Sequence, residues 1–285
     1  MRSLAILSIF ITLCSTAAAQ DSTYIKLEQY KIRNSMLSSF YNVPALKKIS
    51  IPVNYTDMHI HYAQQKSDDY IWQKGSGSNT FDVQFSSFQQ KNNALRVWGA
   101  FDYKNSSIKD VNFNETLDYD YLYPYIMADT VGGDLRNEQY AIAAGLSKTY
   151  NKSTYGAEAS FEGKQSVRNR DPRTQNISAN VNITLSVSQA LTEKYNLALS
   201  LFGDRYFQQA KVAFNSELGR PTIFHETGLG NYNKLFANTK DEAEYLGYNY
   251  GIALHFVPTD QIGWFGRAKY SASIIDKKIK DVSFV

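Results

Sequence analysis

The sequence predicts an all-β protein, an antiparallel transmembrane β-barrel of about ten to eleven strands that is preceded by a signal peptide and a short lead-in. Three observations predict this class. One long segment alternates strictly between apolar and polar residues, the connections between such segments alternate in length, and the N-terminus carries an export signal.

The alternation is clearest between Ile177 and Ser188. Every second residue from Ile177 is apolar, and the residues between them are small and polar. A period of two indicates an extended strand with one apolar face and one polar face. The segment is longer than a typical globular strand of about 5–6 residues, and it reaches the roughly 9–11 residues that a tilted strand needs to cross a hydrocarbon layer. Weaker or shorter versions of the pattern occur at Tyr55–Tyr62, Phe81–Phe85, Leu95–Tyr103, Tyr140–Leu146, Tyr155–Phe161, Tyr195–Leu201, Val212–Leu218, Tyr248–Phe256 and Ile262–Ile274.

The connections fall into two length classes. The short ones are rich in Asn, Pro and Gly, as tight turns are: Lys91–Asn93, Asn151–Ser153, Thr192–Lys194, Gly219–Pro221 and Pro258–Gln261. The long polar ones are Lys104–Asn137, Gly163–Gln175 and Thr227–Glu244. Short periplasmic turns and long extracellular loops are typical of outer-membrane barrels.

The N-terminus predicts export. Arg2 precedes an apolar run from Leu4 to Leu13, and an Ala-Ala-Ala cleavage site ends at Ala19, so residues 1–19 are expected to be a secretory signal peptide. Residues 20–53 form the lead-in, expected as a short amphipathic helix or loose segment in the lumen or the periplasm. Residues 54–285 form the barrel. The one cysteine, Cys14, lies in the signal peptide, so no disulfide framework is expected.

Composition excludes two classes of protein. After the signal peptide no apolar run is long enough for a membrane-spanning helix. The formal net charge is only +3 without a basic run, so no nucleic-acid partner is expected. The chain is rich in aromatic residues, with 21 Tyr and 16 Phe, and several lie toward strand ends, where membrane interfaces favour such rings.

Charged residues of both signs occupy the strand positions that the alternation assigns to the inside. They either line a water channel or pair across a filled lumen, and the sequence leaves both open. The set is Arg96, Asp102, Glu158, Glu162, Glu217, Arg267 and Lys269.

The sequence assigns no catalytic, cofactor-binding or metal-ligating residue, and no cofactor. His59 and His61 share one face of a strand but have no third ligand nearby in the sequence. Acidic pairs in connections, such as Asp118 with Asp120, are expected to be solvated rather than bound to calcium. His225 and His255 could serve a hydrolase, but no Gly-x-Ser-x-Gly element accompanies them.

Four motifs resemble a family of uncharacterised outer-membrane β-barrel proteins from Bacteroidota. They are Leu122–Asp134, Tyr155–Ser160, Arg170–Asn176 and Phe224–Gly230. The resemblance implies the barrel fold and an outer-membrane location, and it brings no activity or ligand. Members of that family are longer and the chain ends just after an outward-going strand, so we expect an N-terminal or truncated portion.

The leading functional hypothesis is a non-enzymatic outer-membrane protein that acts as a porin-like channel, a transport accessory or a structural component of the envelope. Its expected partners are outer-membrane lipid and lipopolysaccharide, the barrel-assembly machinery and other envelope proteins. The first alternative is a secreted or periplasmic soluble β-rich protein that grips a glycan with loop tyrosines such as Tyr119, Tyr121, Tyr123 and Tyr125. The second alternative is a hydrolase embedded in the barrel.

Overall fold

The computed structural model describes residue 37 and residues 39–215, 222–233 and 240–281. It consists of one nine-stranded antiparallel sheet, a three-stranded sheet and a few short helices. The predicted all-β antiparallel fold class is confirmed. The predicted signal peptide, residues 1–19, lies outside the described residues, as do Gly219–Pro221 and Glu217.

The main sheet has the order β1-β2-β3-β5-β6-β7-β8-β11-β12. Its strands are β1 (Tyr55–Lys66), β2 (Gly77–Gln90), β3 (Leu95–Val111), β5 (Gly133–Tyr150), β6 (Ser153–Val167), β7 (Arg173–Ala190), β8 (Tyr195–Ala213), β11 (Lys240–Pro258) and β12 (Gly266–Asp281). The small sheet has the order β10-β9-β4, from β4 (Met127–Asp129), β9 (Ile223–Gly228) and β10 (Asn231–Asn233). The helices are η1 (Pro44–Leu46), α3 (Lys47–Ser50) and α4 (Tyr119–Leu122).

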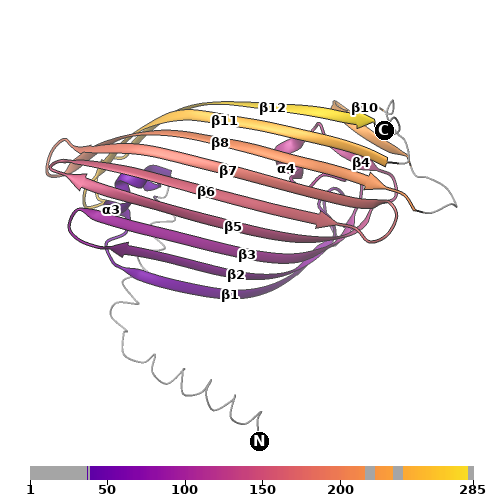
Figure 1. Ribbon diagram of the computed structural model, residues 1–285, viewed down its shortest axis with the longest axis horizontal. Helices are drawn as coiled ribbons and strands as arrows, with labels where there is room; N and C mark the ends of the chain where they lie inside the picture. The colour runs from indigo at the N-terminus through magenta and orange to yellow at the C-terminus, as the bar shows by residue number, and fades with distance from the viewer. Residues whose placement is uncertain (1–36, 38, 216–221, 234–239, 282–285) are drawn as a thin grey trace, which may run out of the picture.

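The main sheet curves like the wall of a barrel, with β1 at one edge and β12 at the other (Figure 1). Within the described residues, neither edge strand has a second neighbour. Because the pairing is antiparallel throughout, the first and ninth strands run in the same direction.

The strands are fewer and longer than the sequence pattern suggested. Tyr195–Leu201 and Val212–Leu218 were expected as two strands, but β8 runs unbroken through 19 residues to Ala213. The expected loop Lys104–Asn137 shrinks to residues 112–132, because β3 and β5 extend into it. These extensions carry polar residues on both faces, and the apolar alternation that marks a strand in the sequence is lost there.

The two ends of the sheet differ in most of their connections, although the expected long connection Gly163–Gln175 is reduced to residues 168–172, because β6 and β7 extend into it. One end, here the turn end, carries the connections 91–94, 151–152, 191–194 and 259–265. In the tightest of them Asn151 adopts a positive φ of 54°, a conformation that Asn tolerates and that two-residue hairpin turns need. The other end, the loop end, carries the connections 67–76, 112–132 and 168–172 and the small sheet.

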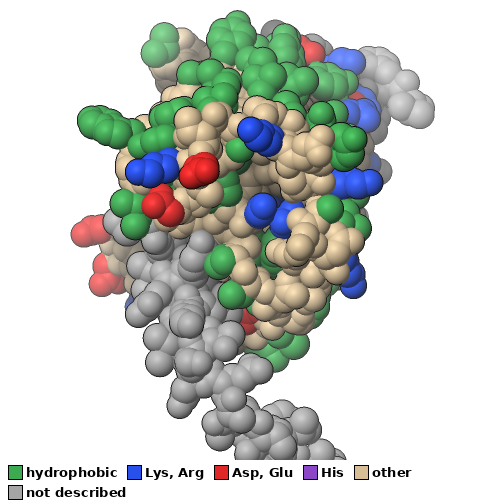
Figure 2. Space-filling view, turned by 90° about the vertical axis from the view of Figure 1, so that its left-hand side faces the viewer, with side chains coloured by type: hydrophobic (Ala, Val, Ile, Leu, Met, Phe, Trp, Pro, Cys, Tyr) green, Lys and Arg blue, Asp and Glu red, His purple; other side chains and the backbone are tan. Residues whose placement is uncertain are grey.

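The two faces of the main sheet follow the predicted alternation. On β7 the outward side chains are large and exposed, with Ile183 at 52% and Leu185 at 54% of full exposure, whereas Ser178 and Ser188 on the inward face are buried. Figure 2 looks onto the turn end and shows hydrophobic side chains gathered mostly on the periphery. An apolar exterior around a polar interior inverts the usual arrangement of a soluble protein.

The buried apolar residues form two clusters, one at each end of the sheet. At the turn end, Tyr41, Val43 and Leu46 from the lead-in pack on Ala198 and Val257. The loop-end cluster joins residues from α4, the segment after it, β4, β9 and the main sheet, namely Leu122, Ile126, Met127, Tyr206, Ala210, Val212, Ile223, Ala243 and Tyr245. The core therefore lies where other segments enter the concave side. Among the described helices, none has the length and apolar content to cross a membrane.

Candidate binding site on the inner wall

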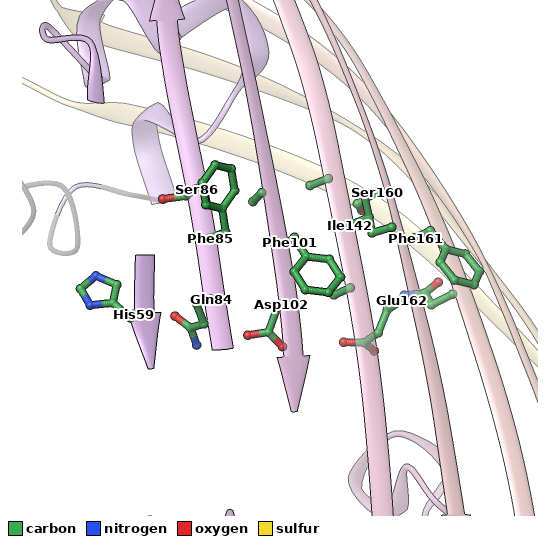
Figure 3. Close-up of a pocket in the computed structure, with 14 residues that line it drawn as sticks. His59, Gln84, Phe85, Ser86, Phe101, Asp102, Ile142, Ser160, Phe161 and Glu162 are labelled. Atoms are coloured by element: carbon green, nitrogen blue, oxygen red, sulfur yellow. The ribbon is translucent and has the colours of Figure 1, made fainter. Parts of the chain in front are cut away.

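The inward side chains of the main sheet form a polar surface, which we call the inner wall. The strand register aligns His59, Gln84 and Asp102 on β1, β2 and β3, and continues through Ala141 on β5 to Glu162 on β6. Figure 3 shows the labelled members of this row side by side. They line a cavity of about 450 Å³, the wall cavity.

A second cavity of about 420 Å³, the cap cavity, lies between the inner wall and residues that lead into α4. Its lining includes Glu162 and Asn180, which also line the wall cavity, so the two cavities adjoin. The full lining is Asp118, Tyr121, Glu162, Lys164, Asn180, Asp204, Tyr206, Asn249 and Ser273.

On one side of the cap cavity, the ammonium group of Lys164 forms ion pairs with two lining carboxylates. The Lys164 ammonium lies 3.0 Å from Asp118 Oδ1 and 2.6 Å from Glu162 Oε1. Asp118 Oδ2 accepts a hydrogen bond of 2.7 Å from the Tyr206 hydroxyl. These contacts fix the chain that leads into α4 against β6 and β8.

The turn end of the concave side is filled by residues 39–51, which we call the turn-end plug (Figure 1). The backbone of Ala45 bonds to two inner-wall serines: its N–H donates to Ser186 Oγ at 2.9 Å, and its carbonyl accepts from Ser188 Oγ at 3.2 Å. Tyr41 donates to the carbonyl of Pro258 at 2.7 Å, and Gln261 donates to that of Ile49 at 2.6 Å.

The close approach of the plug depends on Gly156 of β6. A Cβ at this position would lie 2.5 Å from Ala45 N and from Pro44 C, far inside van der Waals contact. The plug also places Lys47 near the inner wall, 3.7 Å from Glu158 Oε2 and 5.5 Å from the ring centre of Trp98. Part of the lead-in thus lies against the concave side of the main sheet.

The loop end is covered by residues 112–129, which we call the loop-end cap. It is anchored by Arg168, whose guanidinium lies 2.5 Å from Glu115 Oε1 and 3.1 Å from Asp129 Oδ2. All three side chains are buried. Burial, and next the neighbouring Asp129, raise the pKa of Glu115 well above the ordinary value, because one guanidinium cannot neutralise two desolvated carboxylates.

The residues that the sequence offered as possible metal ligands are engaged with neighbouring side chains. His59 bonds to Asp57 at 2.9 Å, and His61 lies 3.5 Å from Asp82. Asp120 pairs with Lys74 at 2.7 Å. In the described part of the chain, no three His, Cys, Asp or Glu side chains are grouped as a metal site would need.

The two candidate hydrolase histidines lie at opposite ends of the molecule. His225 belongs to β9 at the loop end, whereas His255 on β11 donates to the carbonyl of Phe40 in the turn-end plug, at 2.8 Å. Of the inward charged set, Glu158 and Glu162 face lysines, and Arg96 is buried with hydrogen bonds to Thr149 and to the carbonyl of Asn93. The two glutamates thus form ion pairs on the concave side of the sheet, and Arg96 is held by neutral groups.

Comparison with known proteins identifies weak structural likenesses. The siderophore receptor PiuA from Acinetobacter baumannii superposes with a TM-score of 0.37 and 9% identity, over 79% of this chain and 42% of that one. The ferric citrate transporter FecA in its unliganded form gives a TM-score of 0.38 and 10% identity, over 79% of this chain and 36% of that one. The chain thus spans less than half the length of either protein.

No curated protein has a matching sequence. The expected origin in Bacteroidota stays a prediction. The model of one sequence family, described as a family of unknown function (DUF6850), matches residues 44–284, and the chain therefore belongs to that family.

Proposed function

We propose that this chain is a non-enzymatic outer-membrane protein whose curved sheet spans the lipid layer, with an interior that is occluded rather than open. The observation that carries the proposal is the outward face of the main sheet. Large apolar side chains stay exposed on every strand, among them Met58, Phe85, Phe101, Ile142, Phe161, Ile183, Leu201, Ile252 and Ile274.

The apolar band has a border that fits the proposal. On β3 and β5, Tyr103 and Tyr140 pack at 5.0 Å between ring centres, and the next outward residues toward the loop end are the polar Asn105 and Glu138. A ring of aromatic residues followed by polar residues is typical of the surface of a membrane barrel at the headgroup level. Outer-membrane lipid and lipopolysaccharide are the partners that this surface would meet.

Within this class, the filled ends support a transport accessory or binding role over an open porin. The turn-end plug and the loop-end cap both enter the concave side of the sheet. Delivery by the barrel-assembly machinery and contacts with other envelope proteins are part of the same proposal.

Cell fractionation tests the location. The processed protein should sediment with outer membranes and stay there through carbonate and high-salt washes. Recovery in the soluble periplasmic fraction would overturn the proposal in favour of the soluble glycan-binding alternative.

A matched pair of substitutions on β7 tests the faces. Ile183→Arg should lower the free energy of unfolding in lipid vesicles by about 2–4 kcal/mol, the cost of Arg near a bilayer midplane. Asn182→Arg should cost much less, because the neighbouring side chain points to the polar inner wall. Equal costs in urea titrations would mean that the outer face does not meet lipid.

A further inference from the structure

The cap cavity has the dimensions and composition of a ligand site that neither the fold nor the family assigns. Its volume of about 420 Å³ falls within the roughly 300–1,000 Å³ of small-molecule sites. Residues from β6, β7, β8, β11 and β12 converge on it, and the chain leading into α4 closes it from the other side.

On one side of the cavity, the carboxylates already have hydrogen-bond and ion-pair partners within the protein. Both oxygens of Asp118 are engaged, by Lys164 and by the Tyr206 hydroxyl. Glu162 is engaged by Lys164 and by the amide of Gln139, the latter at 3.0 Å. These charges therefore stabilise the packing of the cap on the sheet, and they need no charged ligand to neutralise them.

The opposite side presents open hydrogen-bonding atoms. Asn249 Nδ2 donates to Asp204 Oδ1 at 2.8 Å, which leaves the second carboxylate oxygen of Asp204 and the amide oxygen of Asn249 without a partner in the described part of the chain. Asn180 Oδ1 is buried and also lacks a partner there. A buried acceptor without a donor is costly, and a ligand hydroxyl would relieve that cost.

Two aromatic rings border these atoms. Tyr121 and Tyr206 lie edge to face, with 4.8 Å between ring centres and 67° between ring planes. Ser273 on β12 lines the cavity together with them. Gly247 leaves room for Tyr121, since a Cβ there would lie 2.9 Å from its hydroxyl. The rings therefore stand beside the open acceptors in a fixed orientation.

We propose that the cap cavity binds a small neutral saccharide. The tyrosine rings offer an apolar surface for the C–H face of a sugar, and the amide and carboxylate oxygens accept hydrogen bonds from its hydroxyl groups. Asp204 is the one open carboxylate, so an anionic sugar is disfavoured. The site requires a folded chain but not a particular cellular location, and it therefore stands apart from the membrane proposal.

Isothermal titration of the purified full chain in detergent, with glucose, maltose and cellobiose as probes, tests the proposal. At least one of the three should bind, and glucuronate should bind at least tenfold more weakly than the best of them. The linear diol 1,6-hexanediol, which lacks ring hydroxyls, should not bind.

Substitutions then locate the site. Asp204→Asn and Tyr121→Ala should each weaken binding of the best probe by tenfold or more, with thermal melting confirming that both variants fold. The matched control is Asp82→Asn on β2, the same change on the same inner wall but outside both cavities, and it should stay within twofold of the wild type.

Three results would overturn the proposal: no binding of any of the three saccharides, binding of hexanediol in preference to them, or equal losses in the Asp204 and Asp82 variants. Each concerns the cavity alone, because the titration is independent of where the protein resides.

Discussion

The turn-end plug and the loop-end cap fill opposite ends of the same concave sheet, but different types of interaction attach them to it. The plug is attached by neutral hydrogen bonds to Ser186 and Ser188 and by a close backbone approach at Gly156. The cap is attached by a buried cluster of three ionised or ionisable groups, in which Arg168 bridges Glu115 and Asp129.

This difference predicts that single substitutions will destabilise the two segments to different extents. A neutral hydrogen bond contributes only about 0.5–1.5 kcal/mol net, and water can replace it when the plug leaves the sheet. A buried charge that loses its partner stays in a medium that solvates it poorly. We therefore expect the cap to depend on Arg168 more strongly than the plug depends on any one of its residues.

The largest effect is expected at the cap. Arg168→Met should lower the free energy of unfolding by about 3–5 kcal/mol, because it leaves the buried Asp129 carboxylate and the carboxyl group of Glu115 without their cation. Urea unfolding and limited proteolysis within residues 112–129 would measure the loss.

A control for this substitution lies five residues further along the chain. Arg173 pairs with Asp171 at 3.0 Å, but half of its side chain is exposed. Arg173→Met should cost no more than about 1 kcal/mol, as exposed ion pairs do. Similar losses for both arginines would contradict the assigned role of the buried cluster.

The sequence predicted the apolar outer face of the sheet well, because the alternation of apolar and polar residues in β7 can be read from neighbouring positions. It predicted the strand ends poorly. Asn105 and Ser107 continue β3 beyond the apolar band, and polar residues in an extended strand look like a loop. Glu115 and Arg168, which form an ion pair, are 53 residues apart in the sequence, and no local sequence pattern predicts their contact.

Gly156 illustrates a different limit. Glycine in a strand interior usually weakens it, and the sequence offers no sign that the backbone of a distant segment rests on this position. The sequence singled out three residues of the cap cavity, Asp118, Tyr121 and Glu162, but gave no reason to place them together. Asp204, Asn249 and Asn180 come together through the register of β7, β8 and β11.

A medium effect is expected at the plug. Gly156→Ala should cost about 1–3 kcal/mol if the plug stays docked, as overpacking does. The plug avoids that cost when it leaves the sheet. The variant should therefore spend more time undocked, and trypsin should cleave it after the exposed Lys48 faster than it cleaves the wild type. Gly99→Ala is the control, since its Cβ would meet nothing closer than the Ala143 carbonyl oxygen at 3.5 Å. Equal cleavage in both variants would show that the plug does not rest on Gly156.

The smallest effect concerns the pH response of the cap. Burial and Asp129 raise the pKa of Glu115 well above that of an exposed glutamate, so the folded protein holds a proton that the unfolded chain releases. Stability from this group is therefore complete below the ordinary carboxyl pKa and is lost as the pH rises through the raised pKa.

The slope of that loss is at most about 1.4 kcal/mol per pH unit for one proton, and the attraction of Arg168 for the carboxylate narrows the pH range over which the loss occurs. Glu115→Gln removes the titrating group, so its free energy of unfolding should change less with pH over this range than that of the wild type. Glu193→Gln, in the exposed 191–194 turn, should keep the wild-type slope. Urea titrations at a series of pH values would compare the three proteins, and a wild-type slope in the Glu115 variant would mean that the cap does not retain this proton.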